Sequence, residues 1–217
     1  MLQLDVIVNN LPFLLEGALV TIKLTLIALI CGLPLGITFG LMQSSDSKIL
    51  KGVATAYVSV FRGTPLLVQL MIIFNALPFW GLTLSAFESG ALALALNSAA
   101  YTSQSIRAGI QSVDQGQYDA AKVLGLSYAQ TMQFIILPQA IRNIFPALIN
   151  EMINLLKETA VISVIGELEL FRRGQVIASQ TFLVIEPYLM VGICYYVMIL
   201  ILSNLAAYVE KRMKVNS

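Results

Sequence analysis

Histidine is missing from this sequence altogether, and charged residues make up only 12% of it. The absence of histidine removes the commonest general base, proton relay and zinc ligand, so hydrolytic chemistry is not expected. Cysteine is rare: Cys31 and Cys194 lie inside apolar runs without the spacing of a metal site, so we expect no metal there and two buried small hydrophobic residues. A net charge of +1 gives no concentrated basic face, which argues against nucleic acid as a partner.

Long apolar runs dominate what is present. Hydrophobic residues make up 58% of the chain and its mean hydropathy is +0.82, a balance too apolar for a soluble domain. The sequence therefore predicts an integral, multi-pass protein of the cell membrane. At 217 residues we expect one transmembrane domain over 1–217 with no separate catalytic domain, so any energy source has to be a partner or a gradient.

Five runs are long enough to cross a hydrocarbon core of about 30 Å, which takes about 20 residues of helix. They cover 11–42, 53–78, 86–110, 139–165 and 187–209. The fold class is thus an all-α membrane protein with five transmembrane helices. Residues 1–10 carry no Lys or Arg, so we expect the first run to stay in the mature protein, and the conformation of 1–10 is left open.

The charged residues predict an orientation for these spans. With the N-terminus outside and the C-terminus inside, most cations lie on the cytoplasmic side, as the positive-inside rule requires. These are Lys48, Lys51, Arg107, Lys122, Arg142, Lys211, Arg212 and Lys214. Residues 166–185 then lie outside, where Leu168, Phe171 and Val176 indicate a short amphipathic helix packed on the outer mouth of the bundle.

A polar segment at 111–138, called the polar loop below, interrupts the apolar runs on the cytoplasmic side. Asp114 with Gln117, and Ser127 with Gln130, each have the spacing of a capping box, and Gly125 between them suits a left-handed helix end. We expect a helix, a glycine hinge and a second helix that ends by Pro138. From the caps alone, a structured loop and a docking surface are equally good interpretations.

Three separated motifs resemble the membrane subunits of ABC importers, in the branch that takes up polar amino acids. Asp119-Ala120-Ala121, then Gly125, then Ile135-x-Leu137-Pro138 is similar to their EAA loop, with Asp in place of the usual Glu. The run 61–70, which begins Phe61-Arg62-Gly63-Thr64-Pro65, is similar to a signature of that branch. So are Asn150-Glu151 and 156–159 in the fourth span.

This resemblance implies that the polar loop is a coupling loop. Its first helix would insert into a groove on an ATP-binding subunit through Tyr118, Asp119, Ala120, Ala121 and Gly125. The chain has no phosphate-binding loop of its own, so no cofactor is expected on it, and ATP and Mg would lie on that partner. Two ATPase copies, a second permease subunit, identical or related, and an extracytoplasmic amino-acid-binding protein would complete the importer.

Polar residues inside spans are costly in hydrocarbon and are candidates for substrate contact. Glu151, Asn154 and Glu158 share one face of the fourth span, flanked by Lys157, and Thr159 follows in the motif. An amino-acid zwitterion would match them, with Lys157 on its carboxylate and Glu151 or Glu158 on an ammonium or cationic side chain. Lys157 and Glu158 could instead simply reach the outer interface. The two acids favour a cationic substrate such as arginine, lysine or histidine.

The third span carries a polar stripe at helical spacing that could complete a midplane pocket with Glu151: Asn97, Tyr101, Gln104 and Ser105. The small residues of that span are instead expected to serve close helix packing. In the second span, Gly63, Thr64 and Pro65 should kink or unwind the helix just after Arg62. Arg62 then acts as a gate or inter-span lock, or it forms a salt bridge that fixes the bundle.

The sequence therefore predicts a permease subunit of an ABC importer for polar amino acids, without enzymatic activity of its own. The alternative is an ion-coupled secondary transporter or a channel that does not use ATP. A third hypothesis is a membrane tether or sensor whose loop recruits a soluble protein.

Overall fold

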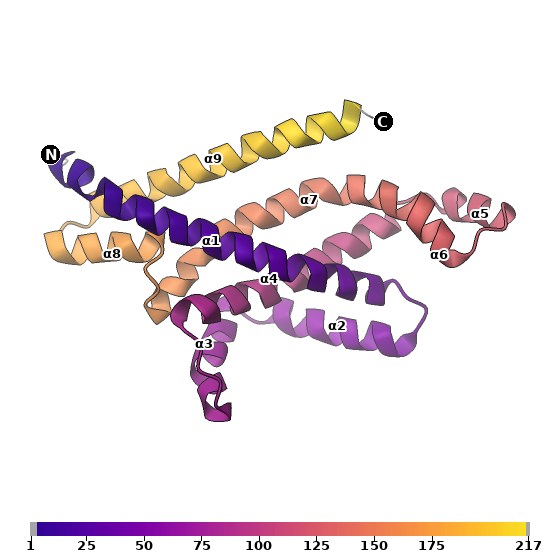
Figure 1. Cartoon of the computed structure of the whole chain (residues 1–217), viewed down its shortest axis with the longest axis horizontal. Coiled ribbons are helices and arrows are strands. Elements are labelled where there is room, and N and C mark those ends of the chain that lie inside the picture. Colours follow the sequence, from indigo (N-terminus) through magenta and orange to yellow (C-terminus); the bar gives the residue numbers. More distant parts are fainter. Residues whose placement is uncertain (1–3, 216–217) are drawn as a thin grey trace.

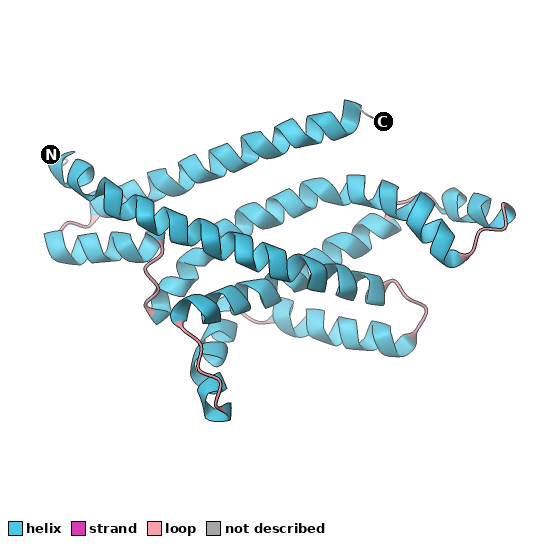
Figure 2. Ribbon diagram, in the orientation of Figure 1, coloured by secondary structure: helices cyan, strands magenta, loops and turns pink. Residues whose placement is uncertain are grey.

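The computed structural model describes residues 4–215, and these fold into helices joined by short turns, with no strand in that range (Figures 1 and 2). The α-helices are α1 (Leu4–Gln43), α2 (Lys48–Gly63), α3 (Leu66–Ala76), α4 (Ala86–Gln111), α5 (Gln115–Val123), α6 (Tyr128–Thr131), α7 (Leu137–Glu158), α8 (Leu170–Thr181) and α9 (Ile185–Val215). Short 3₁₀ turns η1 (Leu77–Trp80) and η3 (Thr159–Ile165) and a π-helical turn η2 (Met132–Ile136) connect some of them. The all-α fold class is confirmed, and α1 extends the first apolar run as helix back to Leu4.

Three stretches of the described chain are long and apolar enough to cross a membrane: Val8–Gln43, Tyr128–Ile165 and Ile185–Arg212. The pair α2 and α3 would be a fourth if it counts as one span. The sequence predicted a further span over 86–110, but α4 does not meet the same test of length and hydropathy within residues 4–215. The physical reason is its composition, because α4 is rich in Ala, Ser and Gly and most of its residues are buried against other helices.

The second predicted span is broken where Gly63-Thr64-Pro65 predicted a break. The axes of α2 and α3 differ by 102°, far more than a kink within one straight crossing. Thr64 and Pro65 are extended, and Pro65 precedes the first residue of α3. Figure 1 shows α3 and η1 turning away from the bundle that α1, α2 and α4 form.

Close contact between α1 and α4 makes the centre of the molecule. Gly32, Gly36 and Gly40, called the glycine ladder below, fall four residues apart on α1 and face α4. A Cβ atom on Gly32 would lie 2.8 Å from the Ala95 carbonyl oxygen, and one on Gly36 would lie 2.7 Å from Thr102. The small side chains that α4 buries against this ladder confirm that they serve packing. The ladder itself was not singled out in the sequence.

A buried polar network ties the end of the bundle that carries α8. Glu169 is fully buried and caps α8 by accepting bonds from the backbone amides of Phe171 (2.8 Å) and Arg172 (2.7 Å). Tyr195 of α9 donates to the same carboxylate at 3.0 Å, and Arg173 pairs with Glu16 of α1. Burial raises the pKa of Glu169 despite these donors. The amphipathic helix is thus confirmed.

Two smaller predictions about side chains were wrong. The face that α8 buries consists of Leu170, Gly174 and Ile177, whereas the predicted Leu168 is exposed. Cys31 is exposed rather than buried, because it lies on the side of α1 that faces away from α4, and Cys194 is half-buried.

Candidate functional site

The polar loop folds as a helix, a glycine hinge and a second helix. Asp114 begins α5 by accepting a bond from the Gly116 amide at 2.8 Å, and Gly125 has φ +73°, a left-handed conformation that glycine adopts without a Cβ clash. Ser127 and Gln130 complete both halves of the predicted capping box, through bonds of 2.9 and 3.3 Å. The helix-hinge-helix prediction is therefore confirmed in form.

Two details of the polar loop differ from the prediction. The second helix does not end by Pro138, because α6 continues through η2 into α7 and Pro138 lies in the first turn of α7. Gln117 does not reach back to complete the first capping box. Its side-chain oxygen instead accepts from Gln139 of α7 at 3.4 Å.

The surface of α5 is divided between packing and exposure. Ala121 is fully buried, and Tyr118 is half-buried beside the cluster around Ile110, donating to the Ile110 carbonyl at 3.5 Å. Asp119 and Ala120 are exposed. Burial is the main cause that raises the pKa of the Tyr118 phenol.

Two exposed apolar residues at the tip of the polar loop were not predicted from the sequence as contact residues. Val123 is 88% exposed and Leu124 is 74% exposed, directly before the hinge at Gly125. Isolated apolar side chains on a surface are ordinary, but two in a row at the tip of a polar loop are typical of a docking contact. Their position between the last charged residue of α5 and the hinge glycine could have identified them in the sequence.

The polar face predicted on the fourth span exists on α7. Glu151 and Glu158 are half-buried, whereas Asn154 and Lys157 are exposed. Glu151 lies beside Ser98 of α4, and Glu158 lies two turns further along α7. The structure therefore brings Glu151 to the α4–α7 contact.

A pocket of about 470 Å³ lies between α4 and α7 below Glu151, at the end of the bundle that carries the polar loop. Asn143 of α7 donates across it to Ser112 at 2.9 Å. Asn143, Ala147 and Glu151 are four residues apart, so the pocket and the carboxylate share one face of α7. The sequence reasoning missed Asn143 and Ser112, although the spacing from Asn143 to Glu151 was readable. The remaining lining residues are Gln104, Ser105, Ala108, Gly109 and Ile144.

Asn97 lies elsewhere, at the break between α2 and α3. Its side-chain amide donates to Gln69 at 3.0 Å, and Gln69 in turn donates to the carbonyls of Phe61 (2.8 Å) and Thr64 (3.1 Å). These carbonyls lose their helical partners where α2 ends. We call Gln69 and Asn97 the amide latch, because both are buried and together they satisfy the broken helix end. The structure therefore does not bring Asn97 to Glu151.

Arg62 and Tyr101 meet on the same side of α4 as the amide latch. The Arg62 guanidinium carbon lies 5.2 Å from the centre of the Tyr101 ring, a cation–π contact between α2 and α4. Both side chains are exposed, and Arg62 forms no ion pair with any residue of the described chain. Of the two hypotheses for Arg62, the fixing salt bridge is thus not formed, and the contact between spans is an aromatic one.

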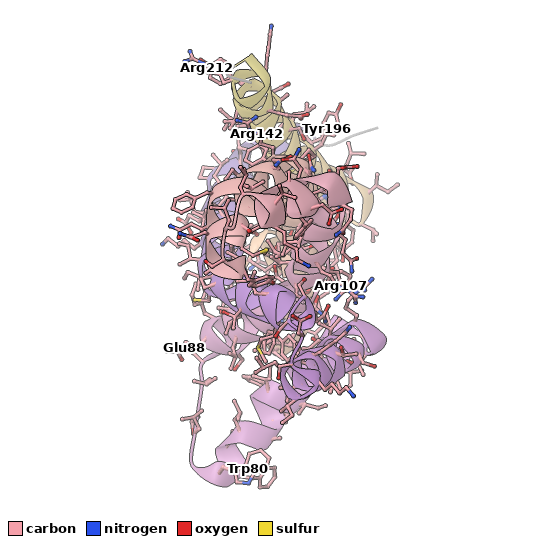
Figure 3. The ribbon with its side chains drawn as sticks, turned by 90° about the vertical axis from the view of Figure 1, so that its right-hand side faces the viewer. Trp80, Glu88, Arg107, Arg142, Tyr196 and Arg212 are labelled. Atoms are coloured by element: carbon pink, nitrogen blue, oxygen red, sulfur yellow. The ribbon has the colours of Figure 1, made fainter. Side chains whose placement is uncertain are left out.

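Thr159 belongs to the buried network at the α8 end rather than to the polar face of α7. It is fully buried, donates to the Leu156 carbonyl at 2.8 Å and lies 3.5 Å from the Tyr195 hydroxyl. Seen along the long axis, Arg107 and Arg142 lie on different sides of the bundle (Figure 3).

Comparison with known proteins gives consistent similarities. Residues 32–215 match the family described as binding-protein-dependent transport system inner membrane component. The chain is 45% identical to a putative glutamine transport system permease protein, GlnP, of Rickettsia conorii over 205 residues, 94% of each chain. It is 42% identical to the arginine transport system permease protein ArtQ of Bacillus subtilis over 216 residues, 99% of each.

Solved structures show the same fold. A chain from the crystal structure of an amino acid ABC transporter with histidines superposes with a TM-score of 0.92 at 45% identity, covering 98% of this chain and 99% of that one. A chain of the inward-facing MetNI methionine ABC transporter superposes with a TM-score of 0.79 at 16% identity, covering 94% of this chain and 97% of that one. The helical arrangement of the membrane subunit is therefore shared even where the sequence has diverged.

Proposed function

Because the chain belongs to the family of binding-protein-dependent transport system inner membrane components, we propose that it forms the translocation pathway of an ATP-driven importer for a polar amino acid. The relatives named above are permeases for glutamine and arginine, and the similar solved structure is an amino acid transporter with histidines. The half-buried Glu151 at the contact of α4 and α7 is the observation in this chain that carries the proposal.

Membership of this family determines which subunit of the importer carries out each step. The chain is a membrane transport subunit and not an enzyme, ATP hydrolysis takes place in a separate subunit, and a substrate-binding protein is the other partner. ATP and Mg are proposed to lie on the ATPase, with no cofactor on this chain. An ion-coupled carrier or a channel that does not use ATP has no support among the similar proteins.

Five crossings with the N-terminus outside remain our proposal for the topology. Helices α1, α4 and α9 run along the long axis in one direction and α2 and α7 in the other, as alternating crossings require (Figure 1). The polar loop and the turn between α1 and α2 lie at one end of the long axis, while α8 and the start of α1 lie at the other. This grouping supports a cytoplasmic end and an outer end.

The polar loop is proposed as the contact for the ATPase. Asp119 and Ala120 are accessible on α5, Ala121 and Tyr118 fix α5 to the rest of the chain, and Gly125 makes the sharp turn behind it. Val123 and Leu124 add an apolar tip that a groove on the partner would bury. Asp119, which stands where the resemblance expects Glu, has its carboxylate free to reach that groove.

The substrate is proposed to pass along the α4–α7 contact. Glu151 would take the positively charged group of the amino acid, and the pocket lined by Asn143 and Ser112 would receive it on the way to the cytoplasm. Lys157, Glu158 and Asn154 are placed one and two turns further out on α7, where they could contact the substrate first. The direct contacts of Asn97, Tyr101 and Thr159 with substrate stay predictions.

A complete importer is proposed to contain two permease chains, identical or related, with two ATPase copies. The side of α7 that bears Lys157 and Asn154 is exposed in the single chain. Charged and polar side chains in a membrane span normally face protein or a water-filled path rather than lipid. A second permease chain across that face would enclose the path.

The replacement Glu151→Gln tests the proposed path in the complex reconstituted into liposomes with its ATPase and binding protein. Loss of a charge-assisted contact should lower ATP-dependent uptake of labelled arginine or glutamine about 10- to 100-fold. An equal loss for both amino acids would assign Glu151 to the α-ammonium group, and a larger loss for arginine would assign it to the side chain.

The matched control is Glu88→Gln, the same change in the exposed first turn of α4. Full uptake by the Glu151→Gln complex would contradict the path. Uptake by the chain alone, driven by a gradient and unaffected by the ATPase, would contradict the importer. If the protein were instead a membrane tether, the wild-type chain would recruit its soluble partner but the liposomes would show no amino-acid uptake.

A further inference from the structure

A second pocket lies at the end of the bundle that carries the polar loop, on a different side of α4 from the proposed path. It measures about 350 Å³ and shares no lining residue with the α4–α7 pocket. Its walls come from four parts of the chain: the end of α1 with the turn after it, the first turn of α2, the last turns of α4, and the start of α5. This volume is at the lower end of the range of about 300–1,000 Å³ that small-molecule sites occupy.

Two cations line this pocket without a partner. Lys51 of α2 and Arg107 of α4 form no hydrogen bond or ion pair with any residue between 4 and 215. One carboxylate, Asp46, also lines the pocket, so the lining carries a net positive charge. The rest of the polar lining consists of amides, hydroxyls and the Tyr118 phenol, which can donate hydrogen bonds to an anion.

The floor of the pocket is held rigidly. The Gln43 side chain is 4% exposed, accepts from Gln104 of α4 at 2.7 Å and donates to the Ala54 carbonyl of α2 at 3.4 Å. Three helices are therefore joined directly beneath the two cations. A site with a fixed floor holds its donors in place before the ligand arrives.

Fewer polar bonds hold the α5 wall of the pocket, which is otherwise fixed by the apolar packing of Ala121 and Tyr118. Tyr118 is the α5 side chain that lines the pocket and bonds to α4, and that bond, to the Ile110 carbonyl, is 3.5 Å long. Gln115 lines the pocket from the first turn of α5. An anion held by Lys51 and Arg107 would thus add contacts between α5 and the fixed floor.

We propose that this pocket binds a phosphate group and that its occupancy fixes α5 against the ends of α2 and α4. A guanidinium and an ammonium at a polar cavity are the usual pair for phosphate recognition. The group has two possible sources, the headgroup of an anionic phospholipid in the adjacent leaflet and soluble inorganic phosphate. Basic pockets between the ends of membrane helices are typical sites for such headgroups.

The test uses the complex of the permease with its ATPase in nanodiscs. One set contains phosphatidylcholine only, a second contains added phosphatidylglycerol, and a third contains phosphatidylcholine with inorganic phosphate. Native mass spectrometry measures the retained lipid, and hydrogen exchange measures the protection of the α5 amides. Phosphatidylglycerol or phosphate should slow exchange in α5, and the arm that does so identifies the source.

The variants Lys51→Gln and Arg107→Gln should each weaken binding about fivefold, and the double variant about 25-fold, with loss of the added protection of α5. Lys48→Gln is the matched control, because Lys48 lies one turn earlier on α2 and does not line the pocket. It should behave as wild type. These readouts do not depend on amino-acid uptake, so they can fail while the proposed path through Glu151 holds.

Three results would overturn the proposal. The double variant could retain the lipid and the α5 protection of the wild type. Lys48→Gln could weaken binding as much as Lys51→Gln, which would mean a general surface charge effect. Loss of the ATPase from the double variant with unchanged lipid and phosphate binding would mean that the two cations dock the partner instead.

Discussion

Several buried polar side chains in this protein serve the ends of helices. Glu169 caps α8 and receives the Tyr195 hydroxyl, and the amide latch satisfies the carbonyls that the end of α2 leaves free. From the sequence, Asn97 was assigned to a pocket because a polar residue in a span suggests a ligand. The hydrogen-bond partner of Glu169, Tyr195, is 26 positions away in the chain, and that of Asn97, Gln69, is 28 positions away. No local sequence pattern reveals such pairs.

The replacement Glu169→Ala should destabilise the end of the bundle that carries α8. It removes two backbone caps and leaves the Tyr195 hydroxyl without its carboxylate, at a cost of about 1–3 kcal/mol. Thermal unfolding in detergent should show a lower midpoint. Glu167→Ala, two residues earlier and without a hydrogen bond in the network, is the control, and equal midpoints for both variants would argue against the network.

A double-mutant cycle on Gln69 and Asn97 distinguishes a latch from a substrate contact. If the two amides act as one unit, Gln69→Ala and Asn97→Ala should each destabilise the chain, and the double variant should cost less than their sum by about 0.5–3 kcal/mol. Denaturation of the purified protein without substrate measures this coupling. Additive losses, with uptake impaired only by Asn97→Ala, would return Asn97 to the substrate path.

At the scale of elements, the sequence predicted where helices are capped or broken, but not the direction in which the chain continues after those points. Ser127 with Gln130, Gly125, and Gly63-Thr64-Pro65 each produced the local geometry that their chemistry predicts. The 102° turn after Gly63 and the passage of α6 through η2 into α7 depend on what packs around them. Proline at the start of a helix and proline after its end have the same local sequence, which is why Pro138 was misplaced.

The glycine ladder can be tested with one added methyl group. Gly36→Ala should lower the unfolding midpoint, because the new Cβ would lie 2.7 Å from Thr102 and force α1 away from α4. Gly52→Ala is the matched control in another helix, with no atom within 4 Å of the new Cβ. It should leave the midpoint unchanged or raise it, since alanine favours helix by about 1 kcal/mol over glycine. The prediction would be contradicted if Gly36→Ala left the unfolding midpoint unchanged and Gly52→Ala lowered it.

For the whole molecule, composition was enough for the class and the resemblance was enough for the family. The number of membrane crossings was harder to predict from the sequence. Hydropathy indicates contact with lipid, whereas α4 mostly contacts other helices and is therefore not apolar enough to be recognised as a span. The same limit applies to the candidate site. Glu151 was found as a charge in a span, but the pocket beside Asn143 exists only once α4 and α7 are packed together.

Cysteine labelling tests the proposed topology. In a background without Cys31 and Cys194, single cysteines at Leu82 and Ser179 should react with an impermeant maleimide added to intact cells. Cysteines at Ser45 and Ala129, at the opposite end of the bundle, should react only after permeabilisation. Labelling of Ala129→Cys in intact cells would place the polar loop outside and contradict its contact with an ATPase.

The glycine ladder also limits how this protein can change shape. With backbone atoms of α4 so near to α1, the two helices have no room to slide past each other, and separation would expose a strip of bare backbone to lipid. Since α5 begins only a few residues after α4 ends, we expect a partner that moves α5 to move α1 and α4 together as one two-helix unit, rather than a single span.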